Sequence, residues 1–157
     1  MEEKFLEELY QNQALIHKVC NMYRDTVEDR EDLFQEIVYQ LWKAYPKFQG
    51  RSKISSWIYR IGLNTAMATF RKPKIKLSKN NKNLENVELP QTFMQESNNE
   101  QLLAAIKKLN EADKALVMLY LEEMSYTEIA EIIGISENYV GVRLNRIKGK
   151  IKKSLNV

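Results

Sequence analysis

Residues that could contact a nucleic acid are concentrated near the C-terminal end of the chain. Residues 125–153 read SYTEIAEIIGISENYVGVRLNRIKGKIKK, in which Arg, Asn and Lys are interspersed with apolar side chains. Arg and Asn can hydrogen-bond the edges of guanine and adenine in the major groove of DNA, and Lys suits phosphates. The segment therefore has the composition of a surface that reads duplex DNA.

A helix-turn-helix would hold these side chains in place. Ser125 and Glu128 have the spacing of a capping box, and Gly134 can end the short helix that they begin. Ser136 can then cap a long basic helix, whose predicted buried stripe is Val140, Leu144, Ile147 and Ile151. The side chains predicted to meet DNA are Asn138, Tyr139, Val142, Arg143, Asn145, Arg146 and Lys148. A basic surface helix that only packs is the alternative.

Charge is unevenly distributed along the sequence. Residues 51–82 carry 9 basic and no acidic side chains, and residues 135–157 carry 6 basic and 1 acidic. Each basic block follows an acidic stretch, so the net charge of the whole chain is only +3. Two basic blocks favour a polyanionic partner such as nucleic acid, although solvated helix faces would have the same composition.

The periodicity of apolar residues predicts an all-α fold. Helices are expected over about 2–24, 28–45 and 53–71, and again from about residue 99, with Asn110 starting a further helix. Residues 73–98 are rich in Asn, Lys and Ser and are predicted to form a flexible linker. The predicted architecture is therefore two small helical domains, 1–72 and 99–157.

Composition argues against several other classes. No apolar run approaches the roughly 20 residues of a membrane span, and the acidic N-terminus has no secretory core. Cys20 and His17 are the only Cys and His, so neither a disulfide nor an ordinary zinc site is expected. Cys20 is expected to be a buried thiol rather than a redox switch. No catalytic residue, cofactor, metal or small-molecule substrate is predicted, and the chain is not expected to be an enzyme.

Two further segments carry a family resemblance. DREDLFQEIVYQLWKAYPKF (residues 29–48) contains D-L-x-Q-E with a downstream Trp, and SSWIYRIGLNTAMATFRK (residues 55–72) follows it. Together with the C-terminal helix-turn-helix, these segments resemble the extracytoplasmic-function (ECF) sigma factors, the small two-domain members of the bacterial sigma-70 family. The resemblance covers residues 5–72 and 97–155.

The resemblance implies a sigma-2-like helical bundle and a sigma-4-like helix-turn-helix in a cytoplasmic transcription initiation factor. Its partners would be the RNA polymerase core (the β′ clamp helices and the β flap), promoter DNA and an anti-sigma factor, with no insertion into a membrane. The residues carried over to the clamp-binding face are Asp32, Gln35, Glu36 and Trp42. Those expected to hold the −10 element are Arg51, Lys53, Arg60, Asn64 and Arg71. The basic C-terminal helix would read the −35 element.

Two points are open from the sequence. Many family members carry a basic residue at the position of Gly141, and the site of Val142 is often small and polar, so the −35 preference is not predicted. Gly141 and Gly149 either let the helix backbone approach DNA or are merely tolerated, at about 1 kcal/mol each relative to Ala. The alternative function is a free-standing helix-turn-helix regulator that dimerises through residues 1–72 and binds palindromic duplex sites.

Overall fold

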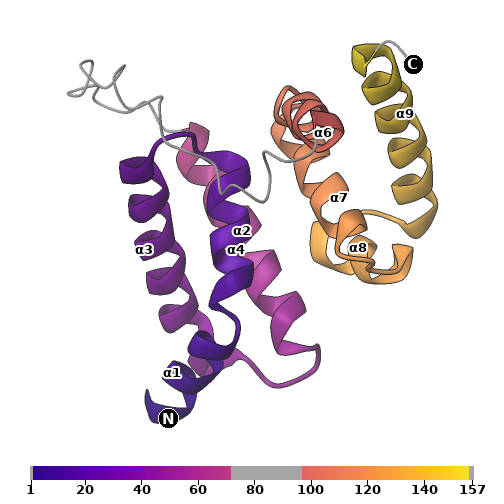
Figure 1. The fold of residues 1–157 in the computed structure, drawn as a ribbon. Coiled ribbons are helices and arrows are strands. Elements are labelled where there is room, and N and C mark those ends of the chain that lie inside the picture. Colours follow the sequence, from indigo (N-terminus) through magenta and orange to yellow (C-terminus); the bar gives the residue numbers. More distant parts are fainter. Residues whose placement is uncertain (1, 72–96, 156–157) are drawn as a thin grey trace. The chain divides into compact units, whose positions relative to one another are not determined.

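Helices are the only regular secondary structure in the described residues, 2–71 and 97–155, of this computed structural model (Figure 1). The chain divides into two compact units, Met1–Val87 and Glu88–Val157. The predicted linker over 73–98 lies outside the described residues, except that Ser97 and Asn98 already belong to a helix. None of the described helices is long and apolar enough to cross a membrane.

The N-terminal unit is built on three helices that pack against one another. These are α2 (Gln13–Tyr23), α3 (Val27–Ala44) and α4 (Ile54–Arg71), which lie side by side in Figure 1. Their core consists of side chains that are at most 1% exposed: Ile16, Val19, Ile37, Leu41, Tyr59 and Leu63. A Cβ on Gly62 of α4 would make ordinary van der Waals contact with Val19 at 3.7 Å and Ile37 at 3.8 Å, so α4 packs closely against both neighbouring helices.

The predicted first helix is two helices, and the prediction of one continuous helix is wrong. The observed elements are α1 (Glu2–Gln11) and α2, separated at Asn12. The Asn12 side-chain amide donates to the Glu8 carbonyl oxygen at 2.8 Å, so it competes with the backbone for that acceptor. The break lets α1 take a direction of its own.

The prediction for the second helix is confirmed to within one residue at each end. Its start follows from Thr26, whose Oγ1 accepts the Asp29 backbone N–H at 3.1 Å, and from Glu28 and Asp29 in the first turn. After α3 the chain makes a 3-10 turn, η1 (Tyr45–Lys47), before it enters α4.

The C-terminal unit contains α6 (Ser97–Lys107), α7 (Glu111–Leu121), α8 (Tyr126–Ile133) and α9 (Glu137–Leu155). The last helix, α9, packs against the other three. Core side chains at most 1% exposed come from α7, α8 and α9: Leu116, Leu119, Ile129, Val140, Leu144 and Ile147. The predicted fourth member of the α9 stripe, Ile151, is only half-buried.

The predicted helix-turn-helix is confirmed, including its caps. Ser125 and Glu128 form a reciprocal capping box, and Gly134 ends α8 with a left-handed φ of 89°. Ser136 Oγ accepts the Tyr139 backbone N–H at 3.1 Å and so begins α9. Asn110 caps α7 in the same way. Polar caps and one glycine therefore determine where α7, α8 and α9 begin and how α8 turns into α9.

Candidate nucleic-acid and protein interfaces

Helix α9 presents almost all of its predicted DNA-facing side chains to solvent. Val140, Leu144 and Ile147 hold its inner side in the core. The predicted residues that are exposed are Asn138, Tyr139, Val142, Asn145, Arg146 and Lys148. Tyr139 and Val142 are 42% and 47% exposed, and Arg143 Cζ lies 5.6 Å from the centroid of the Tyr139 ring. The outer face of α9 thus combines hydrogen-bonding, cationic and apolar groups that a major groove can accommodate.

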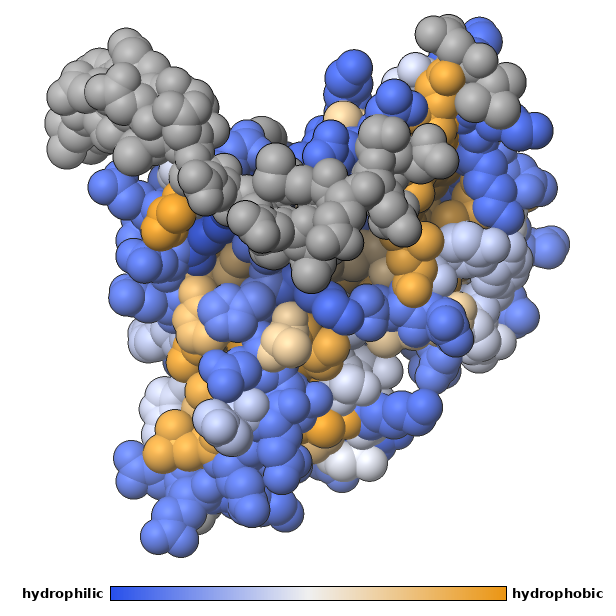
Figure 2. Space-filling view, in the orientation of Figure 1, coloured by the Kyte–Doolittle hydropathy of each residue, from blue (hydrophilic) through white to orange (hydrophobic). Residues whose placement is uncertain are grey.

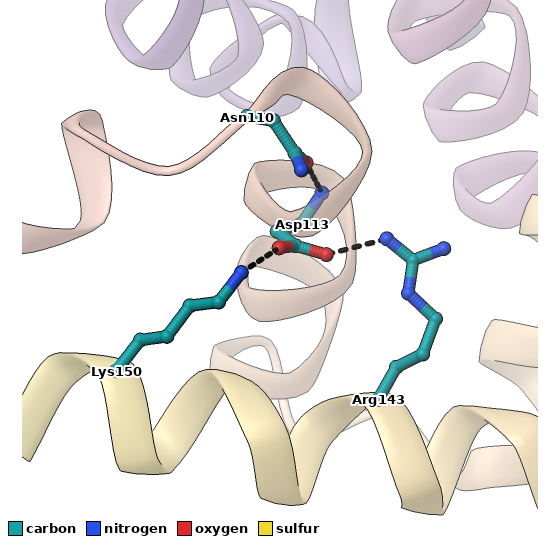
Figure 3. A network of polar contacts seen from close by, with 4 residues as sticks. All are labelled: Asn110, Asp113, Arg143 and Lys150. Carbon is teal, nitrogen blue, oxygen red and sulfur yellow. Dashed lines mark hydrogen bonds and ion pairs between the residues drawn. The ribbon is translucent and has the colours of Figure 1, made fainter.

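Arg143 differs from the other predicted DNA-facing residues. Its side chain is 19% exposed, and its guanidinium forms an ion pair with the buried carboxylate of Asp113 on α7 (Figure 3). Lys150 Nζ lies 3.5 Å from the other carboxylate oxygen. The structure therefore places Arg143 in an internal contact rather than on the outward face. The sequence does not predict this pairing, because Asp113 and Arg143 are 30 positions apart in the chain.

Two other aromatic side chains, Tyr120 and Tyr126, contact residues of α9. Lys148 Nζ lies 4.8 Å from the centroid of the Tyr120 ring, a cation–π distance that keeps the ammonium on the surface. A Cβ on Gly141 would lie 3.3 Å from Cε2 of Tyr126, the first residue of α8. No atom lies within 4 Å of the corresponding position on Gly149. Gly141 is thus explained by packing between α8 and α9, a reason absent from the sequence interpretation, whereas Gly149 adjoins open space.

The second candidate surface is the outer side of α3. Asp32 and Gln35 are exposed and Glu36 is half-buried, while Leu33, Ile37 and Leu41 point into the core, as helical spacing predicted. Glu36 accepts a hydrogen bond from Gln40 Nε2 at 2.9 Å. The structure therefore presents the D-L-x-Q-E polar side chains together on one helix face.

Next to Gln35 the structure has a mainly apolar groove between α1 and α3, of about 390 Å³. Its walls include Phe5, Leu6, Phe34, Val38, Tyr39 and Trp42. Leu6 and Tyr39 are 55% and 54% exposed, and hydrophobic side chains are visible near α1 among largely hydrophilic neighbours in Figure 2. The Trp42 ring meets Phe5 edge-on, with centroids 5.0 Å apart. The sequence could not show this groove, because it depends on how α1 lies against α3 after the break at Asn12.

The third candidate surface surrounds the segment between η1 and α4. Arg51, Lys53, Arg60 and Asn64 are exposed, and the side chain of Arg71 lies outside the described part of the chain. Trp57 is half-buried and has ring centroids 4.8 Å from Phe48 and 6.1 Å from Tyr45. Packing within the fold therefore accounts for Trp57 better than a role as a free stacking platform for DNA bases does.

The start of this segment is tied to α1. Tyr45 donates a hydrogen bond from its hydroxyl to Glu8 Oε1 at 2.7 Å, and this bond raises the pKa of Tyr45. Gly50 has a left-handed φ of 72°, a conformation that glycine adopts easily because it has no Cβ. A polar cavity of about 460 Å³ is lined in part by Lys4, Phe48 and Gln49. The segment is thus held at its start by the Tyr45–Glu8 hydrogen bond, and it forms part of the wall of a cavity.

Cys20 has no part in any of these surfaces. Its side chain is buried in the N-terminal core, and burial raises the pKa of the thiol to about 11. The prediction of a buried thiol is confirmed, and such a thiol is a poor nucleophile. Among the described residues, no group of three or more His, Cys, Asp or Glu could hold a metal ion.

Comparisons with known proteins agree with this geometry. The family model for sigma-70 region 2 matches residues 9–74, and the model for sigma-70 region 4 matches residues 99–151. The ECF RNA polymerase sigma-E factor of Haemophilus influenzae is 30% identical over 141 residues, which are 81% of this chain and 75% of that protein. The ECF sigma factor SigG of Mycobacterium tuberculosis is 38% identical over 60 residues, which are 38% of this chain but only 16% of SigG.

The fold also matches a solved sigma factor. The sigma factor RpoE of Bartonella quintana, solved in complex with the anti-sigma factor NepR, superposes with a TM-score of 0.72 at 16% identity over 99% of this chain and 98% of that one. The two helical units thus correspond to the two sigma-70 regions that the family models match. The chain belongs to the sigma-70 family, in its ECF group.

Proposed function

We propose that the chain binds core RNA polymerase and directs it to promoters by recognising −10 and −35 elements. The observation that carries this proposal is the exposed Asn, Arg and Lys face of α9, presented by a capped helix-turn-helix in the same chain as the exposed D-L-x-Q-E face of α3. The chain acts in the cytoplasm with the polymerase, which carries out the chemistry. It is itself neither an enzyme nor a cofactor-binding protein.

The α3 face would bind the β′ clamp helices. Asp32, Gln35 and Glu36 supply polar contacts, and Trp42 supplies an edge of the adjacent apolar groove. A groove of exposed large apolar side chains beside acidic and amide groups suits a partner helix that has both an apolar stripe and basic residues. The C-terminal unit would meet the β flap.

Contacts to the −10 element would come from the segment after η1 and from α4. Arg51, Lys53, Arg60 and Asn64 are the exposed candidates, joined by Arg71 at the end of α4. Single-stranded DNA needs cations along its backbone and a concave surface for unstacked bases. The cavity lined in part by Phe48, Gln49 and Gly50 offers a concave surface directly before Arg51 in the chain.

Contacts to the −35 element would come from α9, which would lie in the major groove. Asn145 and Arg146 are exposed on the outward side of α9 and would meet base edges, while Lys148 would meet phosphates. Asn138, Tyr139 and Val142 would extend the contact toward the N-terminal end of the helix. Arg143 supports this surface through Asp113.

An anti-sigma factor is also proposed as a partner. The support is the likeness in fold to RpoE, which was solved with the anti-sigma factor NepR bound. Such a partner would block one or both of the polymerase-facing and DNA-facing surfaces. Family membership does not favour the alternative of a free-standing dimeric regulator.

The test is to mix the full chain with bacterial core polymerase and to map transcription start sites on genomic DNA in vitro. We expect a stable complex and a set of start sites that share motifs near −10 and −35. A chain that instead dimerises, binds palindromic duplexes and leaves the start sites of the polymerase unchanged would contradict the proposal. The double variant Arg146→Ala/Lys148→Ala serves as the matched control, because it should weaken the −35 motif while the complex still forms.

A further inference from the structure

The ion-pair network beneath α9 has an arrangement that the proposed DNA contacts do not require. Asp113 lies in the first turn of α7, and its side chain is 6% exposed. The two cations that it holds, Arg143 and Lys150, are 19% and 60% exposed and come from the same side of α9 (Figure 3). Among the described residues, Asp113 is the buried carboxylate.

Physical considerations explain why this carboxylate is stable in the core. A buried charge is costly unless it is paired and hydrogen-bonded. The first turn of α7 favours a negative charge through the helix dipole, and each Asp113 oxygen has a cationic partner. Arg143 and Lys150 are seven residues apart, which corresponds to about two helical turns. Asp113 therefore contacts α9 at two points along its length, which fixes the rotation of that helix about its own axis.

The same network affects the charge that α9 can offer to DNA. A cation whose charge is already neutralised by a buried carboxylate displaces fewer counterions from a phosphate. We propose that Asp113 is a positioning residue of the DNA-reading helix that also withholds Arg143 and Lys150 from the phosphates. Phosphate contact is then left to exposed cations such as Lys148, and sequence-independent binding is kept low relative to base reading. This inference rests on the proposed function, because it concerns the same helix.

The experiment measures how the affinity of the full chain for a short mixed-sequence duplex depends on salt. Each phosphate contact contributes about 0.9 to the slope of log affinity against log salt. Asp113→Asn keeps the shape of the side chain and removes its charge, so it should release both cations and steepen the slope by about 0.9 to 1.8. Adding Arg143→Gln to the Asp113→Asn variant should make the salt slope less steep again, because one of the two released cations is removed. A residue with only a structural role would weaken binding without steepening the slope.

A second pair of variants keeps the inference testable if Asp113→Asn does not fold. Lys150→Gln and Lys148→Gln each remove one exposed ammonium from α9, and only Lys150 faces Asp113. Lys148→Gln should flatten the slope by about 0.9, whereas Lys150→Gln should leave it unchanged. The inference is overturned if Lys148→Gln and Lys150→Gln flatten the salt slope equally. It is also overturned if Asp113→Asn folds and its salt slope does not rise, or if the wild-type chain does not bind the duplex at low salt.

The outcome is distinguishable from failure of the proposed function. Holoenzyme formation and promoter motifs test the proposed function, and they do not depend on the slope for free duplex. A chain that forms the holoenzyme but shows equal slopes for the two Lys variants overturns the inference alone. A chain that shows the expected slopes but never associates with core polymerase overturns the promoter-factor proposal alone.

Discussion

Cε2 of Tyr126 lies 3.3 Å from the position that a Cβ on Gly141 would occupy. The two residues are the first of α8 and a residue of the second turn of α9, so the contact lies within the helix-turn-helix itself. The Tyr126 ring lies against the surface of α9 at Gly141. A side chain introduced at Gly141 therefore requires the Tyr126 ring to shift by a few tenths of an ångström.

The two glycines of α9 should respond differently to alanine. Alanine is better than glycine in a helix interior by about 1 kcal/mol, and Gly149 has no atom within 4 Å of a new Cβ. Gly149→Ala should thus raise the free energy of unfolding by about 0.5–1 kcal/mol. Gly141→Ala should gain less, because its Cβ crowds Tyr126. Urea unfolding of the two variants measures the difference in their free energies of unfolding. In a Tyr126→Ala background, Gly141→Ala should raise the free energy of unfolding as much as Gly149→Ala does. An equal gain at both glycines in the wild-type background would contradict the packing explanation.

The groove beside α3 makes a prediction about polymerase binding. Tyr39 lines the groove and is 54% exposed, whereas Tyr10 is 74% exposed and does not line it. Tyr39→Ser should weaken binding to core polymerase by at least ~1 kcal/mol, roughly fivefold, because a buried aromatic anchor is lost at the interface. Tyr10→Ser is the matched control and should leave the affinity unchanged. Competition binding to core polymerase measures both, and a similar affinity for the two variants would remove the groove from the clamp interface.

Polar residues of the same face can be tested separately. Gln35→Ala combined with Glu36→Lys should weaken association with core polymerase while the helical content measured by circular dichroism stays the same. Gln35 is exposed and Glu36 is half-buried, so neither change should empty the core. Equal holoenzyme yield from the double variant and the parent in a pull-down would exclude these two side chains from the contact.

The buried thiol predicts how stability depends on pH. Cys20 has a pKa of about 11 in the folded chain against an ordinary value of 9.0, because burial disfavours the thiolate. A raised folded pKa means that the stabilisation is present below pH 9 and is lost as pH rises toward 11. The free energy of unfolding should therefore fall over this range more steeply for the wild type than for Cys20→Ala. Iodoacetamide should also react slowly with the folded chain at pH 8, and rapid labelling without unfolding would contradict the assignment.

The sequence was sufficient where one local signal decides the structure. The capping box of Ser125 and Glu128, and the glycine at 134, are local signals, so the helix-turn-helix could be predicted in detail. Asn12 shows where this reasoning fails, because the helical pattern of apolar residues continues on both sides of the break and does not mark it. The apolar groove and the Asp113 network are tertiary features. They join residues more than 20 positions apart, and a helical pattern shows only which side of a helix is polar.

Arg146 and Lys148 make the most specific prediction for DNA recognition. Arg146 is exposed on the side of α9 opposite to Val140, Leu144 and Ile147, so its guanidinium can reach a base edge. Arg146→Ala should cost roughly 1–3 kcal/mol on a cognate −35 duplex and relax base preference at one position. Lys148 lies over the Tyr120 ring on the flank of the helix, so Lys148→Ala should weaken all sequences about equally.

Titrations of the holoenzyme with both variants against matched and singly mismatched duplexes, at several salt concentrations, distinguish these roles. Loss of base preference should follow Arg146→Ala alone, and a salt slope flatter by about 0.9 should accompany Lys148→Ala. Thermal unfolding is the control, because two exposed side chains should leave the stability of the unit nearly unchanged. If Arg146→Ala weakens every sequence alike and Lys148→Ala alters the preference, then α9 lies in the groove with a different face toward the bases. In that case Tyr139 and Val142, which are exposed nearer to the start of the helix, become the base-reading candidates.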